Sequence, residues 1–266
     1  MANLRYMVTN KLADVSLGAS PAMVTTLPQA NLLDARRAYV ARTTSTAAQA
    51  ITGDFAANTT LDCLLLWAHN LTDAATWRLR LYSAVAQGGT LLLDVSAATL
   101  HSAGLFDDWP ANRRFGIKYF AQQTTVRSFQ LDLTDSANPN GYMQLGELWL
   151  GEYTELGFNF EWGAQIEHTD GSTYARTAGG GGYRDNVATV PWRVAKLALN
   201  HLADSEADQL DDISRNNRRF WADLYPGNAN AKRARNGAMV VQSRKGIQVS
   251  RLKTLRGQAT LTLEED

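Results

Sequence analysis

The chain has 266 residues, of which 45% are hydrophobic and 20% are charged, so it can form one large or two ordinary domains and is not wholly disordered. Lys and Arg together number 26, as do Asp and Glu, and the formal net charge is +0. No overall field therefore draws the protein to nucleic acid, an anionic membrane or an acidic substrate. The single cysteine, Cys63, excludes an internal disulfide and a thiolate zinc cluster.

The N-terminal residues Met1–Arg5 do not begin a secretory signal pattern, and no later segment has the length of a membrane span. We therefore expect no export signal and no membrane partner. Protein surfaces and neutral ligands are the partners that this composition favours.

Up to about residue 151 the apolar residues recur with the period of two that half-buried strands show. Trp77–Leu81 and Phe129–Leu133 alternate between apolar and polar residues, so each can place one row of side chains in a core. Leu61–Trp67 is apolar almost throughout, which predicts a central strand covered on both faces. Turn residues separate these strands, notably at 136–141. The pattern predicts a β-sandwich or jelly roll.

Beyond Gly151 the chain carries more charge and more loop residues, and we place a domain boundary there. A strand is predicted at Trp192–Leu199 and a closing strand at Gln258–Glu264. The expected fold class is mainly β, with an N-terminal β-sandwich (jelly roll) over residues 1–152. A C-terminal α+β domain with one principal helix is expected over residues 153–266.

The principal helix is predicted to begin near Ser205, which with Asp208 resembles a capping box. The spacing places Leu210 and Ile213 on one face, toward the core.

The sequence contains no constellation of residues that predicts catalysis. The four glycines at Gly179, Gly180, Gly181 and Gly182 lack the Gly-Lys-Ser/Thr ending of a phosphate loop, and no Gly-x-Ser-x-Gly motif occurs. The four histidines have no metal-ligand spacing, and we expect loop or surface positions for them: His69, His101, His168 and His201. We therefore expect no enzyme activity, no cofactor and no metal.

The group most typical of a sugar site is Asp107, Asp108 and Trp109. Aromatic rings stack on sugar faces while carboxylates bind hydroxyl groups, so these residues are candidate glycan contacts. A loop with a packing tryptophan is the alternative interpretation. A hydrolase with two facing carboxylates is a third class of protein, because scattered acidic residues do not exclude such a pair.

A basic cluster is formed by Lys232, Arg233 and Arg235, after the aromatic segment Phe220–Tyr225. Basic residues interleaved with aromatic ones are typical of single-stranded nucleic acid binding. The aromatic segment also has strand character, which favours a core position and no nucleic-acid partner. We interpret the basic cluster and the glycine run at 179–182 as candidate assembly contacts, the glycine run being a loop that orders on assembly.

Parts of the chain resemble bacteriophage tail proteins. The segments Asn31–Asp34, Leu61–Arg80 and Leu131–Gly151 resemble the galactose-binding-like jelly rolls of siphophage minor tail proteins. The strand–helix–strand run Arg193–Tyr225 and the closing strand resemble the ring-forming domain of tail-tip proteins related to distal tail proteins.

This resemblance implies a structural subunit of the virion at the tail tip, assembled in the host cytoplasm. It would link the tail tube to the baseplate hub or fibres and form a homo-oligomeric ring. Galactose-binding-like relatives often bind glycan or calcium, but no ligand residue here matches a motif, so neither function is carried over. The competing hypothesis is a carbohydrate-binding module that recognises a host surface glycan through Trp109.

Overall fold

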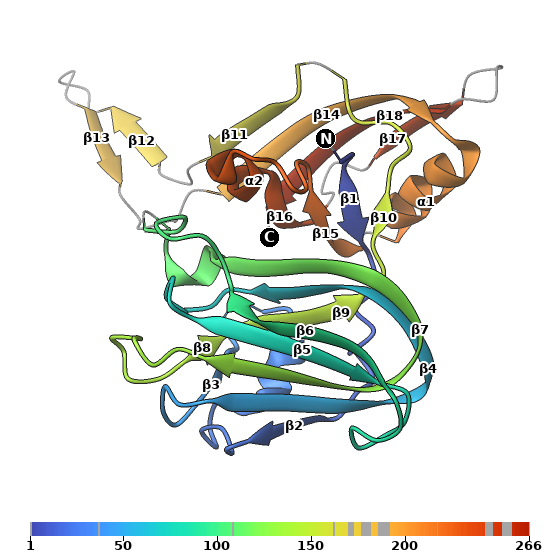
Figure 1. Cartoon of the computed structure of the whole chain (residues 1–266). Helices are drawn as coiled ribbons and strands as arrows, with labels where there is room; N and C mark the ends of the chain where they lie inside the picture. The colour runs from blue at the N-terminus through green and yellow to red at the C-terminus, as the bar shows by residue number, and fades with distance from the viewer. Residues whose placement is uncertain are drawn as a thin grey trace. The chain divides into compact units, whose positions relative to one another are not determined.

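A computed structural model gives the architecture of the chain (Figure 1). The structure describes residues 2–36, 38–107, 109–161, 163–169, 173–176, 182–185, 192–216, 218–242, 247–251 and 257–265. These residues are mainly β, as the sequence predicts, and form two compact units. The sandwich unit is Thr9–Tyr153, and the α+β unit combines Met1–Val8 with Thr154–Asp266.

The sandwich unit contains the strands β2 (Leu17–Ser20), β3 (Ala41–Arg42), β4 (Gln49–Trp67), β5 (Thr76–Tyr82), β6 (Leu91–Thr99), β7 (Phe115–Thr134), β8 (Gln144–Leu145) and β9 (Glu147–Gly151), with 3-10 turns at Gln29–Leu33 and Ala111–Arg113. The two long strands β4 and β7 form an antiparallel ribbon with register shifts between Asp54 and Cys63. At these shifts the ribbon bends, so that its two halves lie in different layers (Figure 1).

Each half of the ribbon pairs with different strands. The first half of β4 pairs with β2, and the second half of β7 pairs with β5, which pairs with β6. The other half of β4, Cys63–Trp67, lies between β7 and β9 and is buried, which confirms the predicted central strand. The core between the layers includes Ile51, Phe129 and Leu148.

The α+β unit contains β1 (Arg5–Met7), β10 (Thr154–Glu155), β11 (Gln165–Thr169), β12 (Thr173–Arg176), β13 (Gly182–Asp185), β14 (Trp192–Leu202), α1 (Asp204–Arg215), β15 (Arg219–Asp223), α2 (Ala231–Gly237), β16 (Ala238–Gln242), β17 (Gln248–Arg251) and β18 (Gly257–Glu265). Its main sheet is antiparallel in the order β10-β1-β15-β16-β18-β14-β11, and β17 also pairs with β18. The strands β12 and β13 pair with each other in a separate two-stranded sheet.

Strands that pair with each other in this unit come from distant parts of the sequence. Tyr6 in β1 pairs with Thr154 in β10 and with Ala222 in β15. The predicted boundary at 152/153 assigns Met1–Val8 to the sandwich domain, whereas the structure places this segment in the α+β unit. The three residues of β1 are too few for their pattern to indicate a partner strand. The sandwich unit is thus inserted between the first two strands of the α+β unit.

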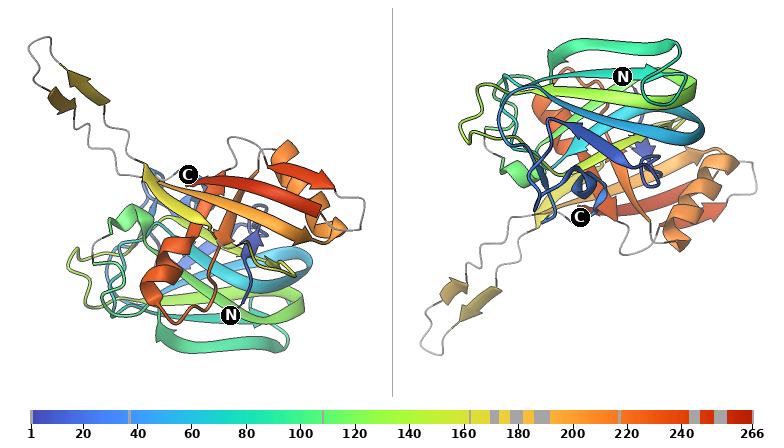
Figure 2. Two further views of the ribbon diagram at one scale, coloured as in Figure 1. Left: turned by 90° about the horizontal axis from the view of Figure 1, so that it is seen from above. Right: turned by 90° about the horizontal axis from the view of Figure 1, so that it is seen from below.

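The helix α1 packs against β14, β17 and β18, whereas α2 packs against β15 and β16 (Figure 2). Leu210 and Ile213 are buried on α1, as the sequence predicts. The helix begins at Asp204, beside the predicted start near Ser205, but the predicted capping pair of Ser205 and Asp208 is wrong. The N-cap is Ala203, whose backbone N–H donates to the carboxylate of Glu206 at 2.7 Å. Glu206 supplies the capping interaction because it occupies the third helical position.

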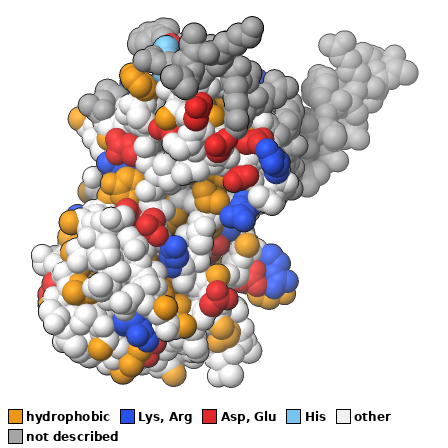
Figure 3. Space-filling view, turned by 90° about the vertical axis from the view of Figure 1, so that its right-hand side faces the viewer, with side chains coloured by type: hydrophobic (Ala, Val, Ile, Leu, Met, Phe, Trp, Pro, Cys, Tyr) orange, Lys and Arg blue, Asp and Glu red, His pale blue; other side chains and the backbone are white. Residues whose placement is uncertain are grey.

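No helix among the described residues is long and apolar enough to cross a membrane. On the face in Figure 3, Lys and Arg side chains lie near Asp and Glu side chains over the described surface, which matches the formal net charge of +0.

Candidate functional sites

Several loops of the sandwich unit meet at one end of its strands. β4 ends at Trp67 opposite Phe115, where β7 begins, and β5 begins at Thr76 opposite both Thr99 and Thr134. The connecting segments 68–75, 100–114 and 135–143 therefore emerge together, and we call them the loop end. Loops on a rigid sandwich are the usual place for binding residues.

Buried polar side chains hold two of these loops together. The carboxylate of Asp135 accepts hydrogen bonds from the backbone N–H of Thr72 at 2.9 Å and from its hydroxyl at 2.6 Å. Asp135 also accepts one from the side-chain amide of Asn138 at 2.9 Å. Asp135 and Asn138 are both buried, so these bonds fix the loops with little competition from water.

Two histidines pack against each other beneath the loop end. The rings of His69 and His101 are stacked with centroids 5.9 Å apart, and both residues are buried. Burial first, and then the positive charges of His101 and Arg114, lower the pKa of His69 to about 3. Both histidines lie in loops, as predicted, but they are buried and not at the surface, because the chain folds their segments onto one another. His168 and His201 are exposed, as predicted.

The ring of His101 also contacts a carboxylate from a neighbouring loop, that of Asp73. The Asp73 carboxylate lies 3.0 Å from Nδ1 of His101 and also accepts a hydrogen bond from the backbone N–H of Gly104. Burial lowers the pKa of His101 below its ordinary value in spite of this carboxylate. Asp73 thus ties the 100–114 loop to the 68–75 loop. Among the described residues, no group of three or more His, Cys, Asp or Glu could hold a metal ion.

The 100–114 loop is built around a buried phenylalanine. The ring of Phe106 lies 4.9 Å from that of His101, 5.2 Å from Phe115 and 5.6 Å from Trp109, measured between centroids. The guanidinium of Arg114 donates to the carbonyl oxygen of Trp109 at 3.3 Å. The position of Trp109 is therefore set by packing beneath it and by a hydrogen bond to its backbone.

The structure brings two of the predicted glycan contacts onto this fixed loop. Asp107 is exposed and Trp109 is half-buried, so a carboxylate and an indole are available close together in the chain. Asp108 lies outside the described residues. Sequence reasoning did not find Asp73, His101 and Phe106, because their roles depend on contacts between separate loops.

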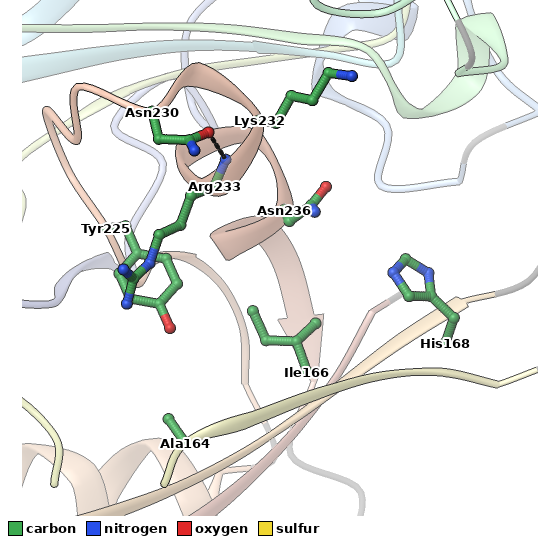
Figure 4. Close-up of a pocket in the computed structure, with 8 residues that line it drawn as sticks. All are labelled: Ala164, Ile166, His168, Tyr225, Asn230, Lys232, Arg233 and Asn236. Carbon is green, nitrogen blue, oxygen red and sulfur yellow. Dashed lines mark hydrogen bonds between the residues drawn. The ribbon is translucent and has the colours of Figure 1, made fainter. Parts of the chain in front are cut away.

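A second site lies in the α+β unit, around α2. A pocket of about 410 Å³ is lined by residues from β11 and the position before it, from the turn after β15 and from α2 with its N-cap (Figure 4). The lining residues are Ala164, Ile166, His168, Tyr225, Asn230, Lys232, Arg233 and Asn236. We call this cavity the α2 pocket.

The predicted assembly contacts lie in different environments. Lys232 and Arg233 are exposed and line the α2 pocket, whereas Arg235 is buried. Gly179, Gly180 and Gly181 lie outside the described residues, and Gly182 is the first residue of β13. The aromatic residues before the basic cluster, Phe220 and Trp221, are 2% and 1% exposed, which confirms their predicted core position.

Comparison with known proteins identifies no family for this chain. No family model and no curated protein matches it. A chitosan-binding module of a chitosanase/glucanase from Paenibacillus sp. IK-5 matches at TM-score 0.42 and 13% identity, over 54% of this chain and 99% of the module. A family 32 carbohydrate-binding module from C. perfringens, solved with galactose, matches at TM-score 0.39 and 11% identity, over 55% of this chain and 98% of the module.

A fucosidase from Ruminococcus gnavus, solved with fucose, also matches at TM-score 0.41 and 13% identity. The match covers 55% of this chain but only 27% of the fucosidase chain.

Proposed function

We propose that this protein binds carbohydrate through the loop end of its sandwich unit, without catalysing a reaction. The observation that carries the proposal is the pairing of the half-buried Trp109 with the exposed Asp107 on a loop held by Phe106. The indole face offers an apolar surface on which a sugar ring can stack, and the carboxylate accepts hydrogen bonds from hydroxyl groups.

The charges at the loop end favour a neutral saccharide. Asp107 is exposed and the side chain of Asp73 is 32% exposed, so two carboxylates lie on neighbouring loops. A carboxylated or sulfated sugar would be repelled by them, whereas a neutral sugar offers hydroxyl donors to both.

Fixed loops reduce the entropic cost of binding. The contacts of Phe106, Asp73 and Asp135 place the loops before a ligand arrives. Binding then costs less ordering of side chains and backbone, which suits a small and weakly held ligand such as a saccharide.

A glycan array tests the proposal with the full chain and three variants. Trp109→Ala removes the stacking surface, and Asp107→Asn removes the charge while leaving the shape. Tyr39→Ala is the matched control, because Tyr39 is a 44% exposed aromatic of the same unit whose ring lies under Arg36. We expect a neutral glycan to bind, and Trp109→Ala to weaken it about tenfold or more, since one stacked aromatic contributes on the order of 1.5 kcal/mol. Equal losses in Tyr39→Ala, or no bound neutral glycan, would contradict the proposal.

Self-association is a second candidate function, favoured by the β12–β13 pair. Within the described part of the chain these strands pair only with each other. A two-stranded sheet alone is marginally stable in water, so pairing with another subunit would stabilise it. This observation favours self-association, and we propose that the chain self-associates as a structural subunit of a phage tail tip, located in the virion and contacting other tail proteins.

Sedimentation of the purified chain over a range of concentrations tests this second role. A homo-oligomer that is lost when residues 173–185 are replaced by a short glycine-serine linker is the expected result. A strict monomer at every concentration, together with absence from purified tail particles, would contradict it.

A further inference from the structure

The α2 pocket has a charge that no described residue neutralises. Its described lining includes Lys232 and Arg233 but no acidic residue, and no described carboxylate forms an ion pair with either. The side chains of Lys232 and Arg233 leave α2 in different directions (Figure 4), and both add positive charge to the lining of the pocket. The electrostatics of the pocket therefore favour a negatively charged ligand.

Arg233 is held so that its hydrogen-bond donors remain available. The guanidinium carbon lies 4.4 Å from the centre of the Tyr225 ring, so the cation rests against an aromatic face (Figure 4). A cation held by an aromatic face keeps the N–H groups of its guanidinium for a ligand. The edge of the guanidinium is the part that grips a carboxylate or phosphate with two parallel hydrogen bonds.

The helix that carries both cations is fixed at its two ends. At the start of α2, the side chain of Asn230 accepts a hydrogen bond from the backbone N–H of Arg233 at 3.1 Å. At its end, the guanidinium of the buried Arg193 donates to the carbonyl oxygens of Arg235 at 3.1 Å and of Asn236 at 2.9 Å. Lys232 and Arg233 are thus presented by a rigid support, which binding sites require.

Another part of the pocket wall is apolar. Ile166 lies in β11 and Ala164 just before it, and both residues are half-buried (Figure 4). The amide of Asn236 and the ring of His168 add polar groups to the lining. A volume of about 410 Å³ is within the range of small-molecule sites.

We propose that the α2 pocket binds a small oxyanion, a carboxylate or a phosphate, that is attached to an apolar or aromatic body. The oxyanion contacts Arg233, the charge of Lys232 adds to the positive potential of the pocket, and the body lies against Ile166 and Ala164. This site lies in the α+β unit and is separate from the proposed saccharide site at the loop end.

Calorimetric titration of the full chain with four probes tests the site: benzoate, phenyl phosphate, inorganic phosphate and neutral benzyl alcohol. We expect saturable binding of benzoate or phenyl phosphate, weaker binding of inorganic phosphate and no binding of benzyl alcohol. The stronger of the first two distinguishes a carboxylate from a phosphate ligand. Binding is expected to weaken as salt concentration rises, because the cations are exposed.

Three variants assign the binding to the pocket. Arg233→Gln is expected to weaken the bound probe about tenfold, since a hydrogen bond to a charged group contributes on the order of 1.5 kcal/mol or more. Lys232→Gln is expected to weaken it less, because Lys232 acts through its charge alone. Arg218→Gln removes an exposed arginine of the same unit that does not line the pocket, and is expected to change nothing. No saturable binding of any anionic probe, or equal binding by Arg233→Gln and Arg218→Gln, would overturn the proposal.

The glycan-array test of the loop end is independent of this result. Lys232→Gln is expected to leave glycan binding unchanged, so failure of one site leaves the other proposal standing.

Discussion

Arg193 and Glu265 form a fully buried ion pair in the α+β unit. Both side chains are 0% exposed, and the guanidinium donates from Nε to one carboxylate oxygen at 3.0 Å and from Nη2 to the other at 3.0 Å. The remaining nitrogen of Arg193 holds the last carbonyl groups of α2. The pair therefore joins the neighbouring strands β14 and β18 to the helix that carries the basic residues.

Removing one member of this pair is expected to be costly. Glu265→Ala leaves the Arg193 guanidinium buried without its main partner, and such a change typically costs about 3–5 kcal/mol of unfolding free energy. The double variant Arg193→Met/Glu265→Leu should regain most of that loss, because it removes both charges. Urea unfolding measures each value.

The exposed pair Lys196–Glu167 provides the control, since it joins β14 to β11 with side chains 48% and 50% exposed. Lys196→Ala should cost less than about 1 kcal/mol, as exposed pairs do. Equal costs for Glu265→Ala and Lys196→Ala would contradict the role assigned to the buried pair.

Part of this arrangement was readable in the sequence. In β14, Arg193 falls on the same alternating, buried positions as Ala195 and Leu197. In β18, Glu265 falls on the same buried positions as Leu263. When two strands are neighbours, opposite charges at positions that face the core indicate a buried ion pair. The sequence alone does not show that β14 and β18 are neighbours.

Strands with strong local patterns were predictable, and contacts between distant segments were not. Leu61–Trp67 is apolar except for Asp62, so its burial on both faces follows from composition. The stacking of His69 on His101 depends on the return of the chain through β5 and β6, which no local pattern encodes. Trp109 and Asp107 were recognised by residue type, whereas Phe106 beneath them resembled any loop phenylalanine.

Acid should destabilise the sandwich unit through His69. The pKa of this histidine is about 3 in the folded chain and 6.5 when exposed, so the unfolded state binds a proton first as the pH falls. The stabilising contribution is complete above pH 6.5 and is lost as the pH falls from 6.5 toward 3, by up to roughly 1.4 kcal/mol per pH unit. Urea midpoints measured at successive pH values follow this loss.

The variant His69→Gln cannot be protonated and should show a shallower decline over the same pH range. The exposed His201→Gln serves as the control and should follow the original protein. A decline in His69→Gln as steep as in the original protein would assign the acid sensitivity to other groups.

Phe106 is expected to control the loop end without touching a ligand. Phe106→Ala removes a ring that is 1% exposed and should cost about 3–5 kcal/mol, as truncation of buried phenylalanine does. Saccharide binding should also weaken, because Trp109 loses the ring that supports it. Phe158→Ala, at a side chain 55% exposed, should change neither quantity. Unchanged saccharide binding in a folded Phe106→Ala protein would show that the loop does not depend on this ring.

Gly146 permits the close approach of the chain to the end of β4. A Cβ atom at this position would lie 2.6 Å from the carbonyl oxygen of Trp67 and 2.7 Å from the Cβ of Ala68. Gly146→Ala should therefore destabilise the sandwich unit by about 1–3 kcal/mol, the usual cost of overpacking. Gly157→Ala is the control, because its nearest atom would lie 3.5 Å away, at ordinary contact distance. Equal denaturation midpoints for the two variants would contradict this steric argument.

The most direct test of the central claim is a crystal structure of the chain with a neutral saccharide selected on the array. The account predicts a sugar ring stacked on Trp109 with a hydroxyl group within hydrogen-bond distance of Asp107, and no saccharide density in crystals of Trp109→Ala. A saccharide bound away from the loop end, with Trp109 uncovered, would contradict it.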